Sequence, residues 1–202
     1  MEKFIISAFF NEVNAKKEKY VDFGLMYIPD DIEIIDDGKK GFKRVELAAI
    51  SSAFYYVKSL DEEILYENTL VMTLHGIDLI TKKANKYIIY EIKGTTKPIK
   101  SPKFYLKKTK NKGRQLSWEW CWKSLCEMAY NPMTSRVFLE LYEEMIYKKI
   151  KRKLIIVECE KLSDGSYMGK KVNLFNADEL LIDDYNFEKE RKFIENLKSE
   201  NE

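Results

Sequence analysis

Three residues near the middle of the chain, Asp78, Glu91 and Lys93, are of the types that a metal-dependent hydrolase needs. Magnesium takes oxygen ligands and keeps several waters, so two carboxylates together with substrate phosphate oxygens can hold it. The bound metal acidifies a water molecule and neutralises charge that develops on a phosphate. A lysine beside both carboxylates keeps its charge and can hold or deprotonate the attacking water. These residues predict a phosphodiesterase site in outline; a Glu-Ile-Lys triplet on a half-exposed edge strand is the alternative.

The segments around these residues predict a β-hairpin that brings them together. Residues 87–95 are rich in β-branched and aromatic side chains, and residues 81–86 are polar enough to form a turn after the segment that contains Asp78. Alternate side chains on a strand share a face, so Glu91 and Lys93 point the same way. The register of the hairpin can then set the aspartate beside them.

This arrangement resembles the motif of the PD-(D/E)xK nuclease superfamily, in which an Asp at the end of one strand is followed by an acidic-x-Lys triplet on the next. Asp78, Glu91 and Lys93 match these three positions. The resemblance implies that Asp78 and Glu91 ligate Mg²⁺, for which Mn²⁺ can substitute. It also implies that the Ile92 carbonyl is a further metal ligand and that Lys93 serves the water. Ile77 stands where the family's name has proline.

A helix is predicted upstream of this motif. Residues 42–57 place apolar side chains at helical spacing, with Val45, Ala49 and Tyr56 near one stripe. The family often places a glutamate on its first helix, facing the metal, and Glu46 is the only carboxylate in this stretch. An ordinary first-turn glutamate that complements the helix dipole is an equal alternative.

A second, amphipathic helix is predicted after the motif. Within residues 113–130, Trp118, Trp122 and Leu125 follow one another in steps of three or four. Many members of the superfamily carry a Gln or Lys near the metal on this helix, and Gln115 matches that place. A buried amide can donate to a water and accept from a lysine at once. A polar helix-start residue without such a role is the alternative, and we favour a place in the site.

Positive charge is concentrated directly after the motif. The net charge is only +2, but residues 97–114 hold no acidic side chain. Pro98 and Pro102 break regular structure, and Phe104 and Tyr105 lie among the lysines. We interpret the segment as a mobile loop that tracks a nucleic-acid backbone and stacks on a base, with a solvated lysine loop as the alternative. Its basic residues are Lys97, Lys100, Lys103, Lys107, Lys108, Lys110, Lys112 and Arg114.

The remaining elements predict an α/β (α+β) fold. Residues 154–159 form a strong strand, and a turn at residues 164–165 leads to its partner at 167–175. A further helix is expected between residues 132 and 153. The resulting α-β-β-β-α-β order is that of the restriction-endonuclease-like core of the family, a central mixed β-sheet flanked by helices.

We expect one nuclease-like domain over residues 1–202, with a core at about 43–160 over which the resemblance extends. Residues 1–41 and 161–202 are then N-terminal and C-terminal extensions. Two strands, a turn and a charged surface helix are predicted in these extensions: residues 4–10, 25–35, 37–38 and 186–202.

Composition excludes several classes of protein. No segment has the length and apolarity of a membrane span or of a signal-peptide core. Cys121, Cys126 and Cys159 have no metal-binding spacing, and their odd number indicates free thiols in a reducing compartment, so we expect a cytoplasmic protein. His75 is the only histidine, so zinc hydrolase and Ser-His-Asp schemes lack their parts.

Three functions are compatible with the sequence. The leading one is a Mg²⁺-dependent endonuclease or exonuclease that acts on DNA in defence, repair or a mobile element. The second is a toxin: residues 114–120 resemble helices of some polymorphic-toxin nucleases, which implies DNA or tRNA as substrate and an immunity protein as partner. The third is a non-catalytic nucleic-acid-binding module or assembly subunit that retains the fold. Cutting both strands of a duplex would also call for a homodimer.

Overall fold

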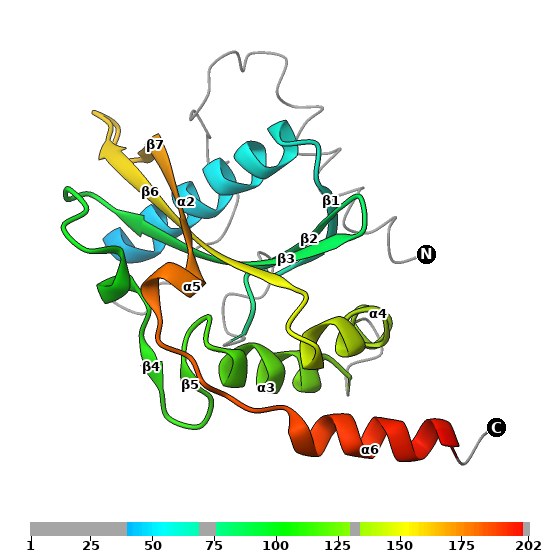
Figure 1. The fold of residues 1–202 in the computed structure, drawn as a ribbon. Helices are drawn as coiled ribbons and strands as arrows, with labels where there is room; N and C mark the ends of the chain where they lie inside the picture. Colours follow the sequence, from blue (N-terminus) through cyan, green and yellow to red (C-terminus); the bar gives the residue numbers. More distant parts are fainter. Residues whose placement is uncertain (1–39, 69–75, 130–133, 200–202) are drawn as a thin grey trace.

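The computed structural model describes residues 40–68, 76–129 and 134–199, which build a central β-sheet with helices on both faces and a small two-stranded sheet (Figure 1). The strands predicted at 4–10 and 25–35, the turn at 37–38 and His75 lie outside the described residues. None of the described helices is both long and apolar enough to cross a membrane. The elements are α2 (Lys40–Ser59), β1 (Glu63–Glu67), β2 (Leu79–Lys83), β3 (Lys86–Thr95), η1 (Pro102–Tyr105), β4 (Lys108–Thr109), β5 (Gly113–Arg114), α3 (Trp118–Ala129), α4 (Ser135–Ile146), β6 (Lys151–Lys161), β7 (Tyr167–Asn176), α5 (Ala177–Leu180) and α6 (Glu188–Ser199).

The sheet has five strands in the order β1-β2-β3-β6-β7. Strands β1, β2 and β3 pair antiparallel, and β7 pairs antiparallel with β6. Strand β6 runs parallel to β3, because the long crossover through α3 and α4 lies between them. The expected α+β class with a mixed central sheet is therefore confirmed.

The two faces of the sheet carry separate hydrophobic cores. Ile88 and Tyr90 of β3 pack with α2 on one face, whereas Ile89 packs with α3 and α4 on the other (Figure 1). This alternation follows from the two-residue period of a strand. Glu91 and Lys93 follow Ile89 at intervals of two residues on β3, so both side chains lie on the face that carries α3.

Glycines allow α2 to lie very close to the sheet. A Cβ at Gly94 of β3 would lie 2.6 Å from the carbonyl oxygen of Val45, and a Cβ at Gly169 of β7 would collide with Ser52. Any larger residue at these positions would push the helix away. The first half of α2, which carries Glu46, is thereby held against the end of β3.

The β2–β3 hairpin turns more tightly than the polar residues predicted. Only Ala84 and Asn85 form the turn, and Ala84 has a φ of 53°. Thr81 is instead a buried strand residue whose hydroxyl donates to the Glu62 carboxylate over 2.5 Å. The polar side chain that suggested a turn therefore makes a buried hydrogen bond. Because β2 begins at Leu79, the preceding aspartate lies just outside the strand.

The helix predicted within residues 113–130 begins later, at Trp118. Gly113 and Leu116 have positive φ angles of 81° and 60°, which a right-handed helix does not allow. The Ser117 hydroxyl accepts the backbone N–H three residues further on over 3.2 Å, as an N-cap does. Gln115 therefore lies in the connection before α3 and not on the helix.

The segment after residue 161, predicted as an extension, contributes to both sheet and core. Strand β7 forms the sheet edge, and Phe187 is fully buried in the core beneath α3 and α4. Its ring lies edge-on to Trp118 and Trp122, with centroids 6.2 Å and 5.8 Å apart. Helix α6 follows on the outer side of α3 (Figure 1).

Candidate active site

Asp78 lies where β2 separates from β3. The ladder between these strands ends at the pair Leu79 and Tyr90, which leaves the following residues of β3 without a strand on that side. Asp78 Oδ2 accepts the backbone N–H of Ile92 over 2.7 Å. The N–H and C=O of one strand residue point to the same edge, so the Ile92 carbonyl also faces the gap beside the aspartate.

Glu91 is the centre of the site. Its side chain is 1% exposed, and Oε1 accepts hydrogen bonds from Lys93 Nζ and Gln115 Nε2. Its other oxygen, Oε2, is buried with no partner among the described residues. A buried carboxylate oxygen without a donor is costly, so this atom is placed to receive a cation or a water.

Gln115 is fixed to the start of the hairpin formed by β4 and β5. Its backbone N–H donates to the Lys107 carbonyl over 2.9 Å, and its Oε1 accepts the Lys107 N–H over 3.0 Å. The amide oxygen accepts from Lys107 and the amide nitrogen donates to Glu91, so the side chain links the lysine segment, residues 97–114, to Glu91. The structure thus brings Gln115 to the site from the connection and not from the helix.

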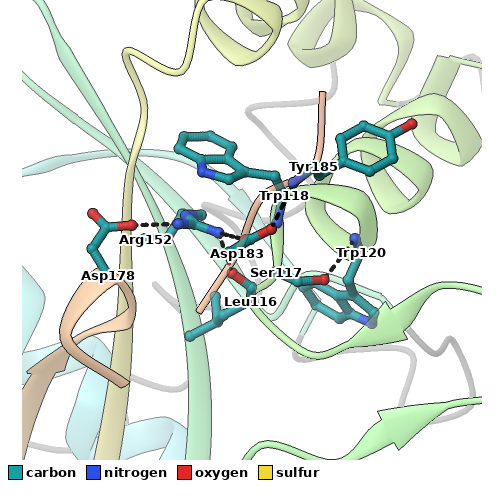
Figure 2. Close-up of polar contacts among 8 residues, drawn as sticks. All are labelled: Leu116, Ser117, Trp118, Trp120, Arg152, Asp178, Asp183 and Tyr185. Carbon is teal, nitrogen blue, oxygen red and sulfur yellow. Dashed lines mark hydrogen bonds and ion pairs between the residues drawn. The ribbon is translucent and has the colours of Figure 1, made fainter. Parts of the chain in front are cut away.

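A buried arginine supports this connection (Figure 2). Arg152 of β6 donates from Nη1 to the carbonyl of Leu116 over 2.8 Å and forms ion pairs with Asp183 and Asp178. Its guanidinium carbon lies 3.9 Å from the centroid of the Trp118 ring, and Asp183 accepts the Trp118 N–H over 2.6 Å. Arg152 therefore holds the left-handed residue that follows Gln115, and the aspartate holds the first turn of α3.

Glu46 approaches from the other side of the strand. The close contact between α2 and Gly94 sets it near the end of β3, and its negative charge raises the pKa of Asp78 and of Glu91. The side chain of Glu46 makes no hydrogen bond with any described residue. Its effect on the site in this structure is electrostatic.

The electrostatics of the site favour binding a cation. Burial, partly offset by Lys93, raises the pKa of Asp78 to about 6, and burial together with the charge of Asp78 raises the pKa of Glu91 to about 8. Burial alone would lower the pKa of Lys93, but Glu91 and Asp78 raise it. A single lysine therefore does not satisfy the two carboxylates, and a bound cation would stabilise them in their charged form.

The oxygen donors fit a magnesium ion better than a zinc ion. Among the described residues, no cluster of three or more His, Cys, Asp or Glu side chains is arranged to hold a metal. Two carboxylates, Asp78 and Glu91, and the Ile92 carbonyl are available as hard oxygen donors. Magnesium needs no more from a protein when waters and substrate phosphates complete its shell.

The lysine segment is more regular than the predicted mobile loop. It forms η1, β4 and β5, and it is anchored in the core by its own Leu106 and by Leu116, which follows it. Two of the predicted phosphate ligands are used within the protein: Lys112 pairs with Glu127, and Arg114 donates to the Leu106 carbonyl over 2.8 Å. The exposed ones are Lys97, Lys100, Lys103, Lys107, Lys108 and Lys110.

Arg152 and Asp183 were not expected from the sequence. Arg152 lies among lysines at the start of β6, and Asp183 lies in an acidic stretch 31 residues later, so neither stands out in the local sequence. The three cysteines, Cys121, Cys126 and Cys159, are free. Burial raises the pKa of Cys126 and of Cys159 to about 11, so both thiols stay protonated at neutral pH.

Comparisons with known proteins add nothing to this geometry. No family model, no curated protein and no solved structure matches the chain.

Proposed function

We propose that the protein is a Mg²⁺-dependent nuclease of the PD-(D/E)xK type, with a restriction-endonuclease-like core and DNA as substrate. The observation that carries the proposal is the meeting of Asp78, Glu91 and Lys93 at the point where β2 leaves β3, with one glutamate oxygen buried and unpaired. The observed order of elements, a helix, three strands, two helices and a strand parallel to the third, also supports it.

Each residue has a role that follows from its contacts. Asp78 and Glu91 would hold the metal, with the Ile92 carbonyl as a further ligand. When bound, the magnesium ion would lower the pKa of a water and neutralise charge on the phosphate. Lys93 keeps its proton beside the carboxylates, so it can orient the attacking water and stabilise negative charge. Gln115 keeps Glu91 in one orientation by donating to Oε1.

A polynucleotide suits this site because the basic segment leads into it. The backbone N–H and carbonyl of Lys107 are both hydrogen-bonded to Gln115, and the Gln115 side chain donates to Glu91. A phosphate backbone that follows the exposed lysines would therefore reach the carboxylates. Glu46, on α2, acts on the two carboxylates through its negative charge.

The test is cleavage of supercoiled plasmid, single-stranded DNA and tRNA with Mg²⁺ or Mn²⁺ against EDTA. We expect metal-dependent cleavage that Glu91→Gln and Lys93→Ala abolish. Glu62→Gln is the matched control, because Glu62 is also a buried glutamate but accepts hydrogen bonds from Thr81 and Tyr90 on the α2 face. It should retain activity.

Three results would reject or redirect the proposal. Cleavage that survives both Glu91→Gln and Lys93→Ala would show that the chemistry lies elsewhere. Equal loss in the Glu62→Gln control would mean that folding, and not the site, is being measured. An absence of cleavage, together with an absence of Mn²⁺ binding in a titration of the same sample, would favour a non-catalytic binding module.

A further inference from the structure

Phe104 is 83% exposed, although it lies on a firmly anchored turn. Its N–H donates to the Ser101 carbonyl over 3.3 Å, and the N–H of the buried Leu106 donates to the Lys103 carbonyl over 3.2 Å. The Leu106 carbonyl in turn accepts from Arg114. The ring is thus held out into solvent by structure on both sides, and an aromatic side chain held in this way loses little entropy when it binds.

The sequence on both sides of Phe104 is basic. Residues 97–114 contain no acidic side chain, and five lysines of this segment are exposed with no ion pair to any described residue. These are Lys97, Lys100, Lys103, Lys108 and Lys110. A polyanion could follow these ammonium groups while the aromatic ring contacts its bases.

Three other exposed apolar side chains lack this combination. Leu139, 66% exposed, is followed by Glu140, and Ile182 is followed by two aspartates. The ring of Tyr147 is already covered by the cations of Lys149 and Arg191. Phe104, in contrast, makes no aromatic or cation–π contact with a described residue. Isolated exposed apolar residues are common, so it is the coincidence with unpaired lysines that sets this one apart.

A short series of contacts connects the turn that carries Phe104 to the candidate active site. Lys107 is three positions after Phe104. Its backbone is hydrogen-bonded to Gln115, and Gln115 donates to Glu91. A nucleotide stacked on the ring would therefore be near the backbone position presented to the carboxylates.

We propose that η1 and β4 form a binding surface for single-stranded nucleic acid, with Phe104 as the platform for an unpaired base. The bases of an intact duplex already stack on one another, so only an unpaired base can offer its face to the ring. This inference deepens the proposed nuclease function by naming its substrate class, and the binding step can be tested without cleavage.

The experiment measures binding by fluorescence anisotropy in EDTA, with Glu91→Gln as the parent protein. The probes are a labelled oligothymidylate, the matching oligouridylate and a blunt duplex of the same length. Phe104→Ala and Phe104→Leu should weaken single-strand binding about 5- to 100-fold, whereas Phe104→Tyr, which keeps the ring, should not. Leu139→Ala is the matched control for loss of an exposed apolar side chain.

The lysines are tested by the dependence of affinity on salt. Lys108→Gln should reduce the slope of log affinity against log salt by about 0.7, as expected for one lost phosphate contact on a single strand. Lys170→Gln is the control, because this lysine is on β7 and pairs with Glu160. An unchanged slope in Lys108→Gln would show that Lys108 is not part of the proposed binding surface.

The outcomes separate this inference from the nuclease proposal. Metal-dependent cleavage combined with unaltered binding by Phe104→Ala would retain the nuclease and overturn the surface. Duplex bound as tightly as single strand, or weakened equally by Phe104→Ala, would overturn the substrate class. Single-strand binding that depends on Phe104, without cleavage of any substrate, would retain the surface and reject the nuclease. The oligouridylate shows whether RNA shares the surface with DNA.

Discussion

Replacing Arg152 with methionine removes the central cation of the buried cluster beneath α3. The arginine side chain is 1% exposed and its partner Asp183 is 7% exposed, so solvent would not take over the lost interactions. An unpaired buried charge costs about 3–5 kcal/mol, and the Leu116 carbonyl also loses its donor. We therefore expect the free energy of unfolding to fall by about 4 kcal/mol, since the two costs overlap. For a chain of this length that corresponds to a Tm lower by about 8–16 °C.

The assay is urea and thermal unfolding of the variant beside two comparisons. Lys170→Met breaks an ion pair whose side chains are 68% and 52% exposed, and should cost about 0–1 kcal/mol. Arg152→Met combined with Asp183→Asn should be more stable than Arg152→Met alone, because the second change neutralises the stranded charge. If Arg152→Met is as stable as Lys170→Met, or if the second change brings no recovery, the buried cluster does not support α3 as described.

Two further predictions concern the helix contact and the carboxylates. Gly94→Ala places a Cβ 2.6 Å from the Val45 carbonyl oxygen and should lower the free energy of unfolding, measured by urea titration, by about 1–3 kcal/mol. Gly76→Ala is the control: a Cβ there meets nothing within 4 Å, so the free energy of unfolding should change by less than about 0.5 kcal/mol. Equal effects of the two substitutions would contradict the close approach of α2. In EDTA, stability should fall as the pH rises from about 5 to 8, because the raised pKa values of Asp78, about 6, and Glu91, about 8, make the folded state bind more protons than the unfolded state. Saturating Mn²⁺ should flatten this pH dependence, and stability that rises with pH in EDTA would contradict the assignment.

Most elements of the fold could be predicted from local patterns, because helices and strands depend largely on neighbours in the chain. The helix expected at residues 42–57 is α2, and the strand expected at 87–95 is β3. The errors arose where a distant contact overrides local preference. Thr81 looked like a turn residue because its hydrogen bond to Glu62 cannot be seen in the sequence, and the start of α3 was misplaced because Leu116 is held in a left-handed conformation.

The sequence by itself determined the residue types of the candidate site and one of their geometric relations. Glu91 and Lys93 share a face of β3 because they are two residues apart on a strand, and this spacing is independent of the rest of the fold. Only the tertiary structure decided that Asp78 reaches the N–H of the next strand and that Gln115 reaches Glu91. These contacts depend on where β2 leaves the sheet and on how Arg152 holds the connection before α3. Contacts between residues far apart in the chain form only when the whole chain packs, and so no local pattern encodes them.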